Sequence, residues 1–472
     1  MTRYLLSVLA SLLLAACAVG PDYTPPVTPP AELQAVEQGT FVDRGPEAAW
    51  WAQFGDAELD SLVTRALGAN LDLQLAVDRV RQARAVFSGE KYDYAPHVPI
   101  EAGYTRSDQQ QPGFGDRPVE TEQYRLGFDA TWEIDLFGHV RRSVEAARAD
   151  LGAEQAALRS AQVMVAAEVA RNYFELRGAQ RRIAVARHNL DNAKETLEQT
   201  RVRYQIGSIS QLDVFRSRSQ FKAVEARIPP LQAAERRAAF RLAVLLGQRP
   251  GALDDELVPV RIAPYAKALP IGNPANLLRR RPDVRIAERR LAAATARVGV
   301  ATADLFPRVN VTGFVGFLSG GSADLFNFGA DGGRAWSVTP TVSWAAFDFG
   351  SLRARLKASE AQADAALTGY HKAVLVALED TQNSLTAYAK EQRRLQSLVE
   401  QAEAASRAAD LAAVQYRAGA VDFLDLLDAQ RIQLEAEDAV AASEARVNVN
   451  VAGVYKALGG VGQPDFTYLS AK

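Results

Sequence analysis

The first candidate site of this 472-residue chain is a pair of carboxylates three residues apart, Asp425 and Asp428. Before them, Gly419 suits the C-cap of one helix and Asp422 suits the N-cap of the next. Side chains at positions i and i+3 lie on one face of a helix, so both carboxylates would point to the same side. They would attract cations, with Arg431 as a candidate partner. The alternative is an ordinary solvated helix start, where the helix dipole favours negative charge.

No other combination of residues predicts catalysis, a cofactor or a metal site. The four histidines are too scattered for the common catalytic metal motifs, and a single cysteine excludes both a disulfide framework and a cysteine-based zinc site. Asp348-Phe349-Gly350 imitates a kinase triplet but lacks a Gly-rich phosphate loop. Arg279-Arg280-Arg281 is a charge run at a helix start, expected to be solvated. The chain is therefore predicted not to be an enzyme.

The N-terminus has the pattern of an export signal. Arg3 precedes an apolar stretch, Leu5 to Leu14, about half as long as a membrane-spanning helix. Leu14-Ala15-Ala16-Cys17 then resembles the lipobox of bacterial lipoproteins, which predicts a signal peptide over 1–16 and a diacylglycerol on Cys17. The alternative is a plain secretory signal with a chance cysteine. Ala18, in place of an inner-membrane retention aspartate, predicts the outer membrane.

The rest of the chain is a tandem repeat. Trp132, Phe137 and Gly138 align with Trp344, Phe349 and Gly350 at a shift of 212 residues, which indicates a duplicated half-domain. We predict an N-terminal segment over 17–56, a first repeat over 57–248, a linker over 249–272, a second repeat over 273–460 and a tail over 461–472.

Each repeat has the same predicted order of elements. The expected helices 57–92 and 275–304 come first, followed by strand pairs at 97–110 and 121–137 and at 307–319 and 334–349, where side chains alternate. Proline-free helices over about 141–206 and 351–418 follow, each about 100 Å long. The second of them carries two apolar stripes, the spacing of a helix that packs on two sides. The fold class is therefore α+β.

Four strands cannot close a barrel by themselves. No run of 18 apolar residues follows the leader, so a membrane span would have to be made of strands in a closed barrel. The smallest such barrels have about eight strands, and three copies of four strands would supply twelve. The sequence thus predicts a cyclic trimer. Because acidic and basic residues nearly cancel, 56 against 54, it does not predict a nucleic-acid partner.

Several short motifs, in this order and spacing, resemble the outer membrane factor family (the TolC superfamily), in its branch of OprM/NodT-type efflux lipoproteins. The resemblance covers nearly the whole chain. Its motifs are Gly20-Pro21-Asp22-Tyr23, Trp50-Trp51-x-x-Phe54-x-Asp56-x-x-Leu59, Asn70-x-Asp72-Leu73, Leu245-Leu246-Gly247 and Pro282-Asp283-Val284-Arg285.

The resemblance implies a passive trimeric exit duct of a tripartite RND-type multidrug or small-molecule efflux system. A twelve-stranded outer-membrane barrel would continue into a long periplasmic α-helical barrel, with an equatorial belt built from segments near 31–56, 249–272 and the C-terminus. It implies a periplasmic gate at Leu424, Asp425, Asp428 and Arg431. It also implies helix-hairpin ends that contact an adaptor at Gly207, Ser208, Leu212, Asp213, Gly419 and Asp422.

The implied partners are two further copies of the chain, a periplasmic adaptor (membrane fusion) protein, an inner-membrane RND transporter and outer-membrane lipid. Two alternatives keep the same architecture: a duct for type I protein secretion and one for metal-ion efflux. A more distant alternative is a periplasmic coiled-coil scaffold lipoprotein without a pore, which the paired amphipathic strands in both halves argue against.

Overall fold

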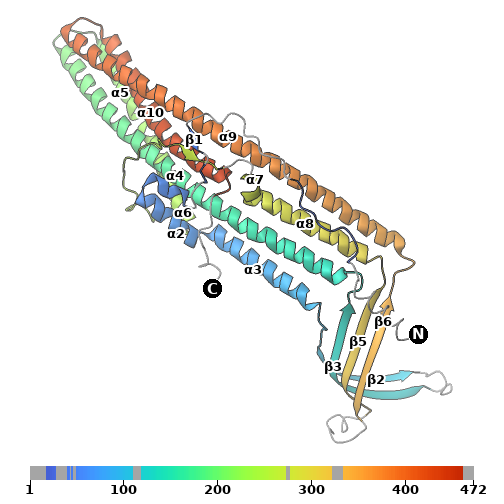
Figure 1. Ribbon diagram of the computed structural model, residues 1–472. Coiled ribbons are helices and arrows are strands. Elements are labelled where there is room, and N and C mark those ends of the chain that lie inside the picture. Colours follow the sequence, from blue (N-terminus) through green and yellow to red (C-terminus); the bar gives the residue numbers. More distant parts are fainter. Residues whose placement is uncertain are drawn as a thin grey trace. The chain divides into compact units, whose positions relative to one another are not determined.

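The computed structural model describes residues 18–27, 40–42, 44–45, 49–109, 118–272, 277–320 and 333–460. Most of this part is helical (Figure 1). The helices are η1 (Trp50–Phe54, a 3-10 helix), α2 (Ala57–Ala69), α3 (Leu71–Tyr92), α4 (His139–Gln205), α5 (Gln211–Glu225), α6 (Ile228–Leu245), α7 (Leu277–Arg280), α8 (Pro282–Ala303), α9 (Phe349–Ala418) and α10 (Phe423–Ala457). The strands are β1 (Phe41–Val42), β2 (Ile100–Gln109), β3 (Val119–Ile134), β4 (Leu269–Pro270), β5 (Arg308–Ser319) and β6 (Arg334–Ser343).

The chain forms two compact units, each assembled from segments of both predicted repeats. Unit 1 comprises Met1–Val27, Arg79–Gln155 and Ile286–Lys372, and unit 2 comprises Thr28–Asp78, Ala156–Arg285 and Ala373–Lys472. None of the helices in the described residues has an apolar stretch long enough to cross a bilayer.

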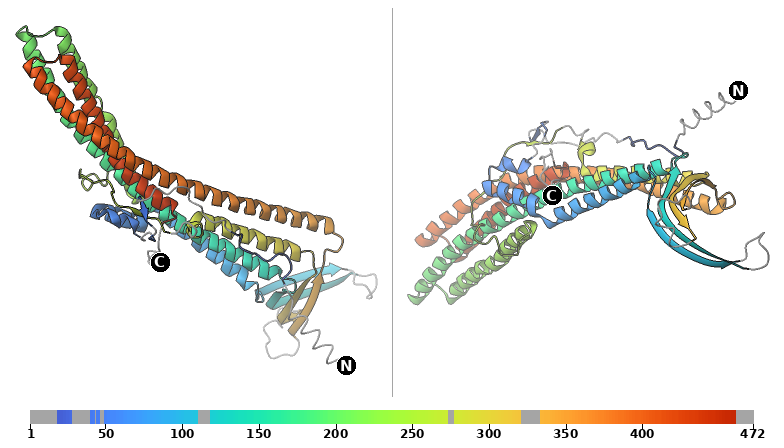
Figure 2. Two further views of the ribbon diagram at one scale, coloured as in Figure 1. Left: turned by 45° about the horizontal axis from the view of Figure 1, so that its top comes forward. Right: turned by 90° about the horizontal axis from the view of Figure 1, so that it is seen from below.

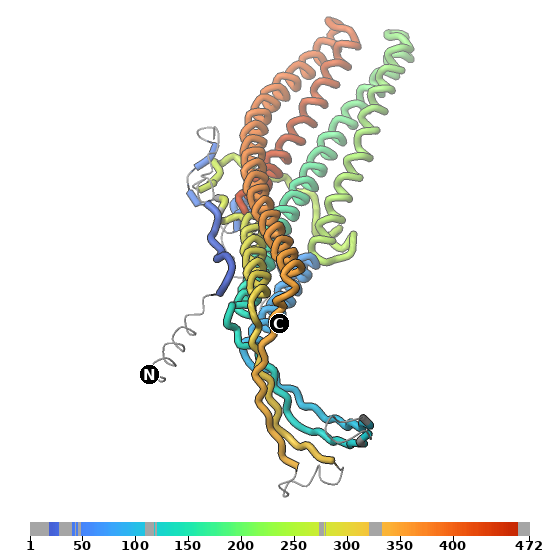
Figure 3. The backbone as a smooth tube through the Cα atoms, turned by 90° about the vertical axis from the view of Figure 1, so that its right-hand side faces the viewer, coloured from blue at the N-terminus to red at the C-terminus, as the bar shows by residue number. Residues whose placement is uncertain are grey.

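Unit 1 contains the four predicted strands, joined in one antiparallel sheet of order β2-β3-β5-β6. The sheet is curved, as Figure 2 and Figure 3 show. The last strand is shorter than expected: β6 ends at Ser343, and Trp344 instead donates its ring N–H to the carbonyl of Leu305 (3.1 Å). Trp132 donates in the same way to the carbonyl of Tyr94 (3.1 Å), so in both halves a tryptophan contacts the segment that leads from a helix into the first strand.

One face of this sheet is apolar and exposed. The register places Ile100 beside Phe128, Phe128 beside Val315, and Val315 beside Trp336. These four side chains are 67%, 49%, 58% and 78% exposed. Neighbouring residues in each strand point to the opposite side, so the row belongs to a single face. The sheet therefore exposes a row of large apolar side chains, which in most proteins would be buried in a core.

Residues of the N-terminal segment 18–27 also belong to unit 1. The amide of Val19 donates to the carbonyl of Phe137 (3.1 Å). The buried guanidinium of Arg142 donates to the carbonyl of Val19 (3.3 Å) and to the carboxylate of Asp22 (2.7 Å). The segment is therefore held at the turn between β3 and α4, beginning two residues after Cys17. Cys17 and the rest of the predicted signal peptide lie outside the described residues.

The predicted helix over 57–92 is two helices, because buried Asn70 interrupts it. Asn70 has an extended backbone (ψ 131°), and its side-chain oxygen accepts from the amide of Leu73 (3.1 Å). Its side-chain nitrogen donates to the carbonyl of Leu245 (2.9 Å). A side chain that satisfies the backbone groups of two helix ends at once allows the helix to break at that residue.

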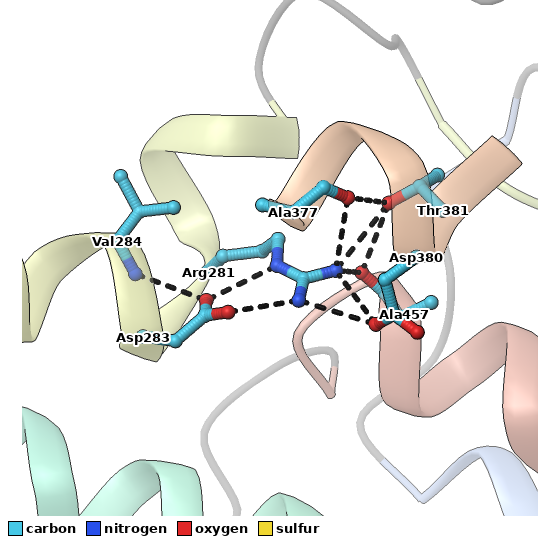
Figure 4. Close-up of polar contacts among 7 residues, drawn as sticks. All are labelled: Arg281, Asp283, Val284, Ala377, Asp380, Thr381 and Ala457. Atoms are coloured by element: carbon cyan, nitrogen blue, oxygen red, sulfur yellow. Dashed lines mark hydrogen bonds and ion pairs between the residues drawn. The ribbon is translucent and has the colours of Figure 1, made fainter. Parts of the chain in front are cut away.

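The predicted solvated run at Arg279–Arg281 is wrong for Arg281. This residue separates α7 from α8 and is only 6% exposed. In Figure 4 its guanidinium lies between the start of α8, the middle of α9 and the end of α10: it donates to Asp283 (2.8 Å), to Asp380 on α9 (3.2 Å) and to the carbonyl of Ala457 on α10. Burial lowers the pKa of Arg281, but its hydrogen bonds and the charges of the two carboxylates outweigh burial and raise it. Arg281 therefore joins the first turn of α8 to α9 and α10 within unit 2.

The core of unit 2 is built on the tryptophan motif. Trp50 stacks on Tyr455 of α10 with ring centroids 5.0 Å apart. Gln53 accepts hydrogen bonds from the hydroxyls of Tyr455 (3.0 Å) and Tyr265 (2.9 Å). Asp56 caps α2 and also accepts from the hydroxyl of Tyr173 on α4 (2.6 Å). One short motif thus connects η1, α2, α4, α10 and the 249–272 segment.

The two apolar stripes predicted on α9 are largely confirmed. Leu352, Tyr370 and Ala377 of the first stripe and Val374 of the second are buried, whereas Leu367 of the second stripe is 36% exposed. The helix after the second turn is also as predicted, since α10 is one continuous helix. Its counterpart in the first half is broken between α5 and α6, where Pro229 and Pro230 stand in the first turn of α6.

Candidate functional site at the helix hairpin ends

The turn between α9 and α10 carries the predicted acidic pair. Gly419 has a left-handed backbone (φ +74°) just after α9, and its amide donates to the carbonyl of Tyr416 (3.1 Å). Asp422, with extended backbone, holds the N-cap position of α10. Both predicted caps are confirmed, and they fix where the acidic side chains of α10 begin.

Asp425 and Asp428 are both exposed, but their surroundings differ. The carboxylate of Asp425 accepts from the backbone amide of Asp422 (3.3 Å), so part of its hydrogen-bonding capacity serves the start of the helix. Asp428 instead forms an ion pair with Arg431 (2.7 Å). Arg431, the candidate partner named from the sequence, thus pairs with Asp428 of its own helix.

Arg431 has a second partner that the sequence interpretation missed. It also pairs with Glu435 (3.2 Å), one helical turn further along α10. Its hydrogen bond with Asp428 and the charge of Glu435 raise the pKa of Arg431. The i,i+4 spacing from Arg431 to Glu435 is the sequence signal that could have identified this partner. The exposed edge of α10 thus alternates acid, base and acid.

The other side of this hairpin end is apolar. Phe423, Leu426 and Leu427 are buried and pack against Tyr416 at the end of α9. Leu424 is 54% exposed and does not belong to that cluster. The hairpin is therefore held together by one face of α10, while Leu424 stays exposed near the charged residues.

The first hairpin end, between α4 and α5, has the same construction. Gly207 has a left-handed backbone (φ +78°), and the amide of Ser208 donates to the carbonyl of Arg203 (2.9 Å). Ser210 and Asp213 then form a reciprocal capping box. Ser210 was missed in the sequence, although serine followed three residues later by an acidic residue is a recognisable helix start. Leu212, the remaining predicted tip residue, is 55% exposed.

Both hairpin ends lie at the same end of unit 2 (Figure 1). The helices behind them are joined by ion pairs and hydrogen bonds: Arg182 of α4 pairs with Asp438 of α10 (2.7 Å), and Asn189 donates to Glu437 (2.9 Å). Among the described residues, no hydrogen bond or ion pair connects the predicted residues of one turn directly to those of the other. No group of three or more His, Cys, Asp or Glu is placed to hold a metal in this part of the chain either.

Comparison with known proteins agrees with this architecture. The model of the outer membrane efflux protein family matches residues 62–248 and again residues 273–460. The chain belongs to this family. The family expected from the sequence is thereby confirmed. The double match covers most of the chain and includes both hairpin ends.

Individual members of the family are similar over nearly their whole length. Nodulation protein T of Rhizobium leguminosarum bv. trifolii is 33% identical over 426 residues, with 89% of each chain covered. Outer membrane protein OprJ of Pseudomonas aeruginosa is 31% identical, with 96% of this chain and 95% of OprJ covered. The outer-membrane channel OprN matches in structure with a TM-score of 0.91 and 47% identity, covering 94% of this chain and 99% of that chain.

Proposed function

We propose that this chain is the outer-membrane exit duct of a tripartite RND-type efflux system for small molecules. It would act as a passive trimer, completed by a periplasmic adaptor and an inner-membrane transporter. Its membership of the outer membrane efflux protein family supports this, as does its similarity to the OprN channel. The two matched segments support the proposed division into two repeats, 57–248 and 273–460.

The apolar face of the sheet in unit 1 is the observation that carries the proposal. Its central row, from Ile100 to Trp336, is exposed, and within the described residues β2 and β6 each have a partner on one side only. An open sheet edge leaves backbone groups unsatisfied in lipid, so the sheet requires neighbours. Three copies would give a closed barrel of twelve strands with the apolar row facing lipid.

The gate and the adaptor contacts are further parts of the proposal. We place the gate at Leu424, Asp425, Asp428 and Arg431, and the adaptor contacts at Gly207, Ser208, Leu212, Asp213, Gly419 and Asp422. The gate residues lie in the first turns of α10 and the adaptor residues at both hairpin turns, where exposed side chains surround capped helix starts. Rigid helix hairpins with exposed apolar tips are suited to contact the helices of another protein.

Oligomeric mass and conductance test the proposed function directly. The purified protein should have the mass of three chains and should conduct ions in a planar lipid bilayer. Crosslinking in native membranes should trap trimers. Dominant monomers or dimers under efficient crosslinking, or a trimer that never conducts, would reject the duct.

The lipid-facing side of the sheet can be tested by one substitution. Val315→Arg should reduce the amount of folded trimer in the membrane, because a charge in the middle of the lipid face costs about 2–4 kcal/mol. Thr312→Arg, three residues earlier on the opposite face of β5, is the matched control and should leave trimer levels near those of wild type. Heat-resistant trimer on gels is the measurement, and equal loss in both variants would contradict the assignment of faces.

We also propose that the mature chain is anchored by lipid at Cys17. The segment from Val19 onward is held at the turn between β3 and α4, so acyl chains on Cys17 would lie close to the end of the sheet where β3 leads into the long helix α4. Cys17→Ser should abolish lipidation and leave the signal peptide poorly processed. Intact-mass spectrometry of the wild type decides the matter: a mature N-terminus at Cys17 without added acyl mass would refute the anchor.

A further inference from the structure

A groove of about 680 Å³ in unit 2 is lined by small and apolar residues and by a group of arginines. It lies between α4, α6 and α10, all of which contribute to its walls. Five arginines line it, against one carboxylate, that of Glu175. The arginines are Arg171 and Arg182 on α4, Arg237 and Arg241 on α6, and Arg446 on α10.

Only two of the five arginines are neutralised by ion pairs. Arg171 pairs with Glu168 and with Glu175, both at 2.7 Å. Arg182 pairs with Asp438, as described above. Across the described residues, Arg237, Arg241 and Arg446 form no ion pair or hydrogen bond, and all three are exposed. The groove therefore holds three guanidinium groups whose charge is not matched at close range.

Positively charged residues of the groove lower the pKa of a neighbouring carboxyl group, that of Glu168. The pKa of Glu168 is lowered first by its hydrogen bond with Arg171, and Arg241 and Lys456 lower it further by their charge. The positive charges beside Glu168 thus favour the ionised form of a carboxyl next to the groove.

The floor of the groove is a close contact between α4 and α10. A Cβ placed on Gly178 would lie 2.5 Å from the Cβ of Ala445, so the glycine is what permits this approach. The floor is therefore set by helix backbones, with the longer arginine side chains standing around it. Such a site is largely formed before any ligand arrives.

Arg171, one of the two groove arginines of α4, lies on the side of the helix opposite the core of unit 2. Val169 and Tyr173 are buried in that core, which η1, α2 and the 249–272 segment cover. Arg171 and Glu175 follow them by two residues each, which is about 200° around a helix. On α10, exposed Arg446 lies about 100° from buried Val447, to one side of the core-facing residues of that helix.

This arrangement decides which way the groove faces in the proposed trimer. The covering segments (η1, α2 and 249–272) are bulky, and three copies of them inside the ring would fill the bore of a duct. They must then lie outside, which places the groove on the inner wall. The inference in this form rests on the proposed function.

We propose that the groove is an anion-binding site on the wall of the duct, suited to organic anions that carry carboxylate, sulfonate or phosphate groups. Guanidinium groups bind such oxyanions through two parallel hydrogen bonds. Three unpaired arginines from each of three copies would raise the local concentration of anionic cargo inside the bore. Negatively charged substrates would thus be favoured once they have passed the hairpin ends.

The test uses the full-length trimer and pyrophosphate as the probe. Pyrophosphate should block single-channel current in the wild type, and the block should weaken with rising salt. The triple variant Arg237→Gln/Arg241→Gln/Arg446→Gln should need at least about tenfold more pyrophosphate for half block. A naphthalene sulfonate should also block, which tests organic anions, whereas its uncharged parent should not block, which shows that the negative charge is required.

The matched control removes the same charge outside the groove, as Arg236→Gln/Arg249→Gln/Arg261→Gln. This variant should be blocked like the wild type, and equal weakening in both triple variants would overturn the proposal. Calorimetric binding of pyrophosphate to the detergent-solubilised protein provides a readout that does not need a conducting pore. A protein that conducts ions but does not bind pyrophosphate would reject the proposed anion site and would still support the proposed exit duct. Binding that is lost only in the groove variant of a non-conducting protein supports the site and rejects the duct.

Discussion

Arg281→Ala is expected to lower the free energy of unfolding by about 3 kcal/mol. Its removal takes one donor from the carbonyls of Ala377 and Ala457 and from the hydroxyl of Thr381, although that hydroxyl still donates to both carbonyls. It also leaves two carboxylates without a cation, and breaking a buried ion pair costs about 3–5 kcal/mol. Because Asp283 and Asp380 are each 42% exposed, water can solvate them, and the loss should fall at the low end of that range.

The neighbouring arginine is the matched control for this prediction. Arg280 is exposed, so Arg280→Ala should change stability by less than about 0.5 kcal/mol. Arg281→Lys should be intermediate, since it keeps the charge but cannot reach several partners at once. Guanidinium unfolding followed by circular dichroism measures all three variants. If Arg281→Ala and Arg280→Ala unfold at the same denaturant concentration, the hydrogen bonds around Arg281 do not stabilise unit 2.

A large change in channel behaviour is expected at Arg431. In the proposed trimer, Arg431→Ala removes the partner of Asp428 and Glu435 from three hairpin ends at once. The remaining carboxylates repel one another across the narrow mouth, so the closed state should loosen. We expect resting conductance to rise at least about twofold, with the increase falling at high salt. Single-channel recording in matched salt is the measurement.

The double variant Asp425→Asn/Asp428→Asn should change the ion selectivity of the channel, in contrast to Arg431→Ala, which should change its resting conductance. Asparagine keeps an acceptor for the amide of Asp422, so the start of α10 is preserved while the charge is lost. Cation preference and block by multivalent cations from the periplasmic side should both fall, by about fivefold. Asp213→Asn is the control, because Asp213 holds the same capping position in the other hairpin. Unchanged selectivity, block and resting conductance in the Arg431 and aspartate variants would place the gate elsewhere.

The sequence was sufficient for the features that short stretches of chain decide. Alternation in the strands and the absence of proline from the long helices predicted β3, β5, α4 and α9 within a few residues. Gly419 and Asp422 could be assigned as caps because a cap is made by residues a few positions apart. The same local rules would have found Ser210. The family followed from many such short motifs in a fixed order.

Tertiary structure decided the features that depend on distant residues. Arg281 looks solvated in its own sequence, but one of its acceptors, the carbonyl of Ala457, lies 176 residues away. Asn70 interrupts a helical pattern because it binds the carbonyl of Leu245, 175 residues away. The arginines of the groove come from three helices and look like ordinary solvated residues on each one. Burial, helix breaks and concentrated charge are set by partners in space, and hydrophobic periodicity and capping signals report only neighbours in the chain.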